Sequence, residues 1–164
     1  MAKSDSFFIR AKIDTNGLTY AQASIDLGAY VDALGKSVLR IHGVSVQYGS
    51  PTHIPLAGNN ANSMTAYQLT TQTQSAMVDA TDKSLISSGR LVVGTAAANN
   101  TSVSDMADLS PEMFRQGYLV AVEQIYLATD SVTAAAVDQV SVVLECTVET
   151  LSQAAAMALA LSQQ

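Results

Sequence analysis

Side chains able to do acid–base, nucleophilic or metal chemistry are few and far apart along this chain. His42 and His53 are the two histidines, and neither stands in a recognisable catalytic motif. Cys146 is the single cysteine, which excludes an internal disulfide and a thiolate zinc site. His42 lies in phase with Val44 in a strand-like run and is expected to be structural. Cys146 is expected to be a small buried hydrophobe.

Other ligand-binding motifs are incomplete. Gly35-Lys36-Ser37 resembles the end of a phosphate-binding loop, but the position that requires glycine is Tyr30. Clustered carboxylates could bind Ca²⁺, yet they lack the spacing of a calcium loop and suit helix caps better; they are Asp79, Asp82, Asp105, Asp108 and Glu112. We therefore predict that the chain is no enzyme and has no catalytic residue, cofactor site or metal site.

Length and composition indicate one folded domain with an unusual surface. The 164 residues are 48% hydrophobic and only 13% charged, and the polar character comes from 18 Ser and 14 Thr beside 25 Ala. A net charge of −6 argues against sequence-independent binding of phosphate backbones. No direct sequence-specific nucleic-acid contact is expected either. The longest apolar run, Ala154–Leu161, is too short to span a membrane. We predict a single domain over residues 1–164.

Strand-like runs separated by turn residues dominate the chain. Val140–Val148 alternates between apolar and polar residues, and Ser37–Tyr48 does so with a change of phase at Gly43 that predicts a bulge. Asn16-Gly17 is a hairpin signal between the first two strands. Further strands are expected at Ser6–Ile13, Thr19–Leu27, Met64–Thr73, Arg90–Gly94 and Tyr118–Ala128. Tyr118–Ala128 is apolar in both phases, which implies either burial of both faces, or one face in the core and the other against a neighbouring subunit.

Helical segments are short and few. Ser110-Pro111-Glu112-Met113 predicts one helical turn, and Asp79–Ser88 suits a short helix. The Ala-, Leu- and Met-rich end predicts an α-helix over residues 151–162. About eight strands, short helical turns and one terminal helix, without βαβ alternation, predict an all-β antiparallel sandwich or single jelly roll.

Two classes of function fit this pattern. A surface poor in charge loses little solvation when it packs against copies of itself, which predicts a self-assembling subunit. Its interface is expected at Tyr118 and along the last helix, at Leu151, Ala154, Ala155, Ala158 and Leu161, although that helix could equally cover its own sheet. The alternative is a non-catalytic carbohydrate- or ligand-binding β-sandwich that uses two long loops, Gly49–Ser63 and Thr95–Asp108. A metal-dependent jelly-roll enzyme would need a cluster of histidines that this chain lacks.

Three stretches resemble the small single jelly-roll capsid proteins of environmental, marine icosahedral viruses: TYAQASIDLGAYVDALGKSVLRIHGVSV (Thr19–Val46), GYLVAVEQIYLA (Gly117–Ala128) and VVLECTVETLSQAAAMALALSQQ (Val142–Gln164). The resemblance implies a capsid subunit, made in the host cytoplasm and located in the virion, that forms capsomers of an icosahedral shell. Its implied partners are copies of itself, either alone or together with a second coat protein. Lys3, Arg10 and Lys12 are the only basic residues among the first 35, so the chain departs from capsid proteins with a basic arm.

Overall fold

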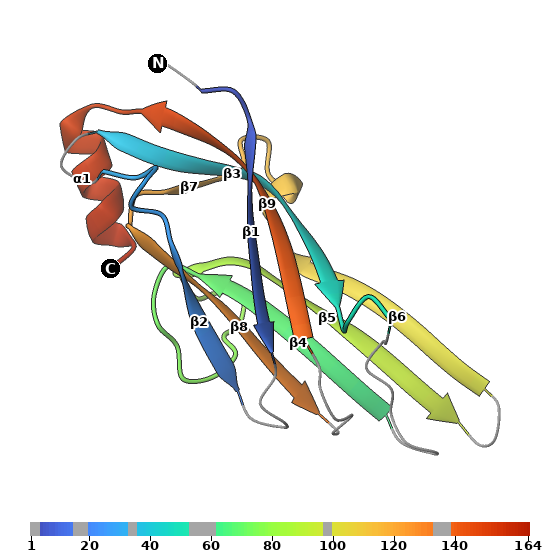
Figure 1. The fold of residues 1–164 in the computed structure, drawn as a ribbon. Coiled ribbons are helices and arrows are strands. Elements are labelled where there is room, and N and C mark those ends of the chain that lie inside the picture. Colours follow the sequence, from blue (N-terminus) through green and yellow to red (C-terminus); the bar gives the residue numbers. More distant parts are fainter. Residues whose placement is uncertain (1–3, 15–19, 33–35, 53–61, 97–99, 133–138) are drawn as a thin grey trace.

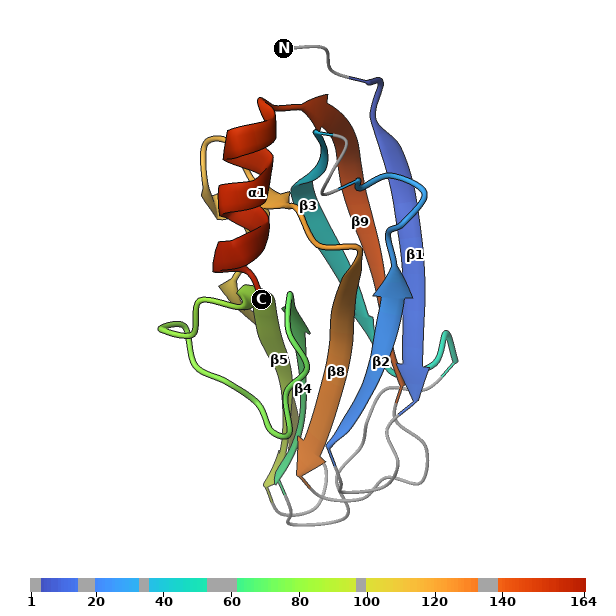
Figure 2. The same cartoon turned by 90° about the vertical axis from the view of Figure 1, so that its left-hand side faces the viewer.

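The computed structural model describes all residues except 1–3, 15–19, 33–35, 53–61, 97–99 and 133–138. Two antiparallel sheets pack face to face, which confirms the predicted β-sandwich (Figures 1 and 2). Within the described residues the elements are β1 (Phe7–Asp14), β2 (Ala21–Asp26), β3 (Ser37–Tyr48), β4 (Asn62–Thr70), β5 (Leu85–Ala96), β6 (Asn100–Leu109), the 3₁₀ turn η1 (Pro111–Met113), β7 (Tyr118–Val120), β8 (Gln124–Val132), β9 (Gln139–Thr150) and α1 (Gln153–Ser162).

Strand order identifies the sandwich as a jelly roll. One sheet has the order β1-β9-β3-β7 and the other β2-β8-β4-β5-β6. β1 pairs with β9, β2 with β8, β3 with β7 and β4 with β5, so the chain is wound like one long hairpin rolled onto itself. β6 is added to the outside of β5 as an edge strand.

Alternation along β9 and β3 builds the core. Val140, Val142, Leu144 and Cys146 of β9 are buried between the sheets, which confirms the strand and the buried thiol. The register of β3 against β9 shifts between Ile41 and Gly43, which confirms the predicted bulge. The extra residue there turns His42 away from the core that contains Val44, and its Nε2 lies 2.9 Å from Thr147 Oγ1.

Four expectations from the sequence are wrong. Tyr118–Ala128 is not one strand: β7 ends at Val120 and β8 begins at Gln124 in the other sheet, which explains the apolar residues in both phases. Thr95–Asp108 is not a loop, because β5 and β6 pair along it. Asn16-Gly17 itself lies outside the described residues, but the strands on either side of it, β1 and β2, belong to different sheets and do not form a hairpin. Asp79–Ser88 forms turns and the start of β5 rather than a helix.

Burial of Cys146 leads to a prediction about alkaline stability. Burial raises the pKa of this thiol to about 12 from 9.0, so the folded chain keeps a proton that the unfolded chain releases. The contribution of this thiol to stability should therefore be constant well below pH 9, and above pH 9 it should fall by up to about 1.4 kcal/mol per pH unit. Urea unfolding at pH 8, 9 and 10 measures this slope, and the Cys146→Ala variant should lose most of it. An unchanged slope in that variant would assign the effect to the tyrosines, because burial also raises the pKa of Tyr67 to about 12.

Candidate interaction surfaces

The helix α1 is fixed to its own sheet by small side chains. Its N-cap, Ser152, accepts a hydrogen bond from the backbone N–H of Ala155 (3.3 Å). Ala156 and Ala160, one turn apart, are buried against Val38 and Ala121. Because alanine is small, the helix axis can approach the outer face of the β3–β7 end closely (Figure 2).

A side-chain amide secures the end of this helix. Gln163 follows α1 and is buried. Its Oε1 accepts from the N–H of Ala121 (2.9 Å), and its Nε2 donates to the carbonyl of Leu119 (2.6 Å). These two bonds satisfy main-chain groups next to β7, the edge strand of its sheet. The helix is therefore a cover for its own subunit on this side.

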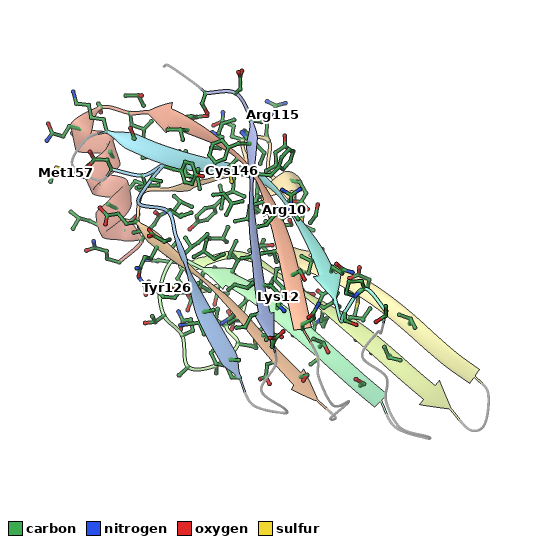
Figure 3. All side chains as sticks on the ribbon, viewed as in Figure 1. Arg10, Lys12, Arg115, Tyr126, Cys146 and Met157 are labelled. Carbon is green, nitrogen blue, oxygen red and sulfur yellow. The ribbon has the colours of Figure 1, made fainter. Side chains whose placement is uncertain are left out.

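The opposite side of α1 is apolar and exposed. Ala154, Met157, Ala158 and Leu161 follow the spacing i, i+3, i+4, i+7 and form one stripe, which we call the outer helix face. Leu161 is 70% exposed and Met157 44%, and the helix contains no charged residue (Figure 3). An apolar stripe without charged neighbours is typical of a surface that another molecule covers.

The predicted interface residues fall into three environments. Ala154, Ala155, Ala158 and Leu161 are exposed on α1. Leu151 precedes the helix and packs partly against the cluster around Val38. Tyr118 lies apart from them, half-buried against the main core, and burial raises the pKa of its hydroxyl. Sequence reasoning missed Met157, whose place in the i, i+3, i+4, i+7 series was the available signal.

The connection between β6 and β7 exposes a second pair of large apolar side chains. Met113 and Phe114 both have about half of their surface exposed. The 3₁₀ turn η1, which ends at Met113, is anchored because Glu112 Oε2 accepts from the N–H of Val44 (3.1 Å) at the bulge of β3. Glu112 is therefore a structural carboxylate, but it binds the N–H of a strand residue and not a helix end, so the helix-cap interpretation was wrong for this residue.

A polar row crosses the outer face of the β9–β3 pair. Arg40 and Glu149 form a bidentate ion pair, with Nε–Oε1 at 2.6 Å and Nη2–Oε2 at 2.8 Å. The Glu149 hydrogen bond raises the pKa of the Arg40 guanidinium. Arg40 also donates to the carbonyl of Gln116, which ties β3 to the segment after η1. This geometry holds strands together and involves no free reactive group.

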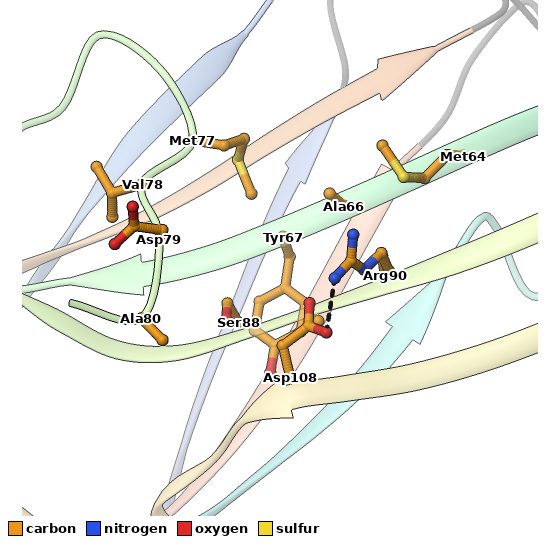
Figure 4. A pocket seen from close by; sticks show the side chains of 11 residues that line it. Met64, Ala66, Tyr67, Met77, Val78, Asp79, Ala80, Ser88, Arg90 and Asp108 are labelled. Carbon is orange, nitrogen blue, oxygen red and sulfur yellow. Dashed lines mark hydrogen bonds and ion pairs between the residues drawn. The ribbon is translucent and has the colours of Figure 1, made fainter. Parts of the chain in front are cut away.

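A pocket of about 520 Å³ lies on the outer face of the five-stranded sheet (Figure 4). Its lining includes Met64, Met77 and the ion pair of Arg90 with Asp108 (2.9 Å). Gln68 holds the bordering loop, since it donates to the carbonyl of Ala76 and accepts from the N–H of Val78. The pocket is the feature that a ligand-binding role would use.

The loops and acids predicted for ligand binding are placed differently. Most of Gly49–Ser63, including His53, lies outside the described residues, and Thr95–Asp108 is largely strand. Asp79 and Asp82 accept hydrogen bonds from Thr81 and Ser84 two residues on, which lowers the pKa of both carboxyls. The described part of the chain contains no group of three or more His, Cys, Asp and Glu side chains placed to hold a metal ion. Among the same residues no helix has the length and apolarity to cross a membrane.

Comparisons with known proteins do not assign the chain to a family. No protein-family model matches the sequence, and no curated protein matches it. Among solved structures the chain is similar to one of Desmodium yellow mottle tymovirus, with a TM-score of 0.35 and 10% identity over 90% of each chain. At that similarity the function has to be argued from the residues of this chain itself.

Proposed function

We propose that the chain is a structural coat subunit, a viral capsid protein that assembles with copies of itself. The outer helix face is the observation that carries the proposal. A stripe containing Met157 and Leu161 stays exposed on a helix whose other side is already packed. Covering it in a closed, symmetric assembly removes apolar surface from water.

Composition favours copies of the same chain as the cover. Only 13% of residues are charged, so little charge must be desolvated when two such surfaces meet. The abundant Ser, Thr and Ala side chains lose little rotamer freedom on burial. Both properties reduce the cost of association without adding a specific ligand site.

The jelly-roll winding and the resembling segments support the same role. The three stretches that resemble capsid proteins supply β2 and β3, β7 and β8, and β9 with α1. They therefore include strands from both sheets and the helix with the outer face. On this proposal the protein is located in the virion, has no enzymatic activity, and contacts other copies, either alone or together with a second coat protein, within an icosahedral shell.

Replacing Leu161 by Asp tests the proposal. A charge at the C-terminal end of the outer helix face should weaken assembly by about 10- to 100-fold in concentration, because one buried leucine contributes about 1.5–3 kcal/mol. Sedimentation velocity and electron microscopy of the purified chain measure assembly, and circular dichroism measures the fold.

Ser162→Asp is the matched control. It adds the same charge to the same exposed turn but lies outside the outer helix face, so it should assemble nearly as the unmodified chain does. Equal loss in both variants would remove the contact role of the face. An unmodified chain that stays monomeric at millimolar concentration would overturn the coat function in favour of a binding module.

A further inference from the structure

β6 is the outer strand of the five-stranded sheet. It pairs with β5 on one side, and the sheet order places no strand of the described residues on its other side. Residues 103–108 are all exposed. A ten-residue edge offers unpaired N–H and C=O groups to any strand that can align with it.

The other sheet edges are protected in ways that the first half of β6 is not. β1 carries Arg10 and Lys12 on its exposed side (Figure 3), β2 has six residues, and β7 has three and is followed by the Gln163 bonds. In β6 the charged residues and the bulge lie in the second half of the strand. Asp105 is followed by Asp108, the extra residue where the register against β5 shifts. Asn100–Ser104 carries no charge, proline or bulge.

Val103 shows which face a further strand would extend. It pairs with Val93 of β5, a core residue that is 1% exposed, yet Val103 itself is 52% exposed. The row of side chains on the inner face of the sheet therefore continues from Val93 of β5 to Val103 of β6, where the sheet ends. A strand added beside β6 would cover Val103 and lengthen that apolar row.

Self-pairing restricts the possible registers. A twofold axis perpendicular to the sheet keeps each face on its own side, so residues of the same parity must lie opposite each other. Centring on Asp105 opposes two carboxylates, and centring on Ser104 places Asp105 opposite Val103. Centring on Val103 places it opposite its own copy and Asp105 opposite Thr101, without opposing charges.

We propose that β6 pairs antiparallel with β6 of a second copy, with Val103 opposite Val103 on the twofold axis. Residues 100–106 of each copy take part, and the two five-stranded sheets become one continuous sheet. The bulge at Asp108 ends the pairing because it bends the strand away. This inference rests on the proposed self-assembly and names one of its contacts, separate from the outer helix face.

Cysteine cross-linking tests the register. The Val103→Cys variant places two thiols within the Cα separation that a disulfide needs. In the Asp105→Cys control the thiols are four residues apart along the strand, roughly 13 Å, which is too far. Mild oxidation and non-reducing electrophoresis should give dimers at least about tenfold faster for Val103→Cys. Cys146 is buried and contributes no background.

The outcomes separate this contact from the coat function. Equal cross-linking in both variants overturns the register, and particles that form without any Val103 cross-link overturn the edge pairing while the coat function stands. Val103→Lys should reduce assembly because it opposes two like charges on the axis; normal assembly of that variant also counts against the pairing. Cross-linked dimers that never form particles support the pairing and overturn the coat function. A strict monomer overturns both.

Discussion

Replacing Glu149 by Gln should lower the free energy of unfolding by about 3–5 kcal/mol, the cost of removing one partner from a buried ion pair. The side chains of Arg40 and Glu149 are only 12% and 8% exposed. Without the carboxylate, the guanidinium stays buried beside neutral acceptors, the carbonyl of Gln116 and the amide oxygen of the replacement, and the NH₂ group of the replacement cannot accept the second hydrogen bond. Urea unfolding followed by circular dichroism measures the change.

Two variants show whether charge is the cause. The double replacement Arg40→Met with Glu149→Leu removes both charges and should cost less than Glu149→Gln alone, because no charge is left uncompensated. Asp108→Asn breaks the exposed Arg90–Asp108 pair and should have a much smaller effect. If Glu149→Gln were as mild as Asp108→Asn, the Arg40–Glu149 pair would not stabilise the fold.

Replacing Gly117 by Ala is expected to destabilise the protein by about 2–5 kcal/mol. Gly117 has a φ of +64°, a conformation that costs an L-residue roughly 1–2 kcal/mol. A Cβ there would also collide with the carbonyl oxygen of Ile41, which is backbone and cannot turn aside. To avoid this collision, β7 would have to move away from β3 at the Ile41–Tyr118 pair, at a further cost of about 1–3 kcal/mol. Thermal and urea unfolding measure the loss.

Gly43→Ala is the matched glycine control. A Cβ at Gly43 would lie 3.6 Å from Glu112 Oε2, an ordinary contact, and Gly43 has no positive φ. Its cost should be about 1 kcal/mol or less. A result in which Gly43→Ala destabilises as much as Gly117→Ala would show that loss of glycine in general, and not the collision with Ile41, is responsible.

Local pattern was enough to predict the class of fold. Alternation in Val140–Val148, the phase change at Gly43 and the Ser110-Pro111 turn each correspond to an observed strand, bulge or 3₁₀ turn. The terminal helix was also predicted, and it begins two residues later, at Gln153. These features depend on residues that are close together in the sequence, because the spacing of apolar residues shows which side chains are buried.

The helix illustrates what local pattern leaves open. The sequence left open whether the stripe with Ala154 and Leu161 covers its own sheet or a neighbour; in the structure Ala156 and Ala160 pack on the sheet, while Ala154 and Leu161 are exposed. Both sides of the helix are apolar, so sequence periodicity could not choose between them. Only the position of Val38 and Ala121 beneath it decides which side is covered.

From the sequence alone came the alternation of the strands, the bulge, the helix and a surface with few charges. The tertiary structure alone decided which strands pair, that Tyr118–Ala128 is divided between two sheets, and that Asp105 and Met106 belong to an edge strand. It also joined Arg40 to Glu149 across 109 residues. The physical reason is that the spacing of apolar residues and the composition of a segment depend on which of its own side chains are buried. Which strands pair depends instead on the free energy of the whole sandwich.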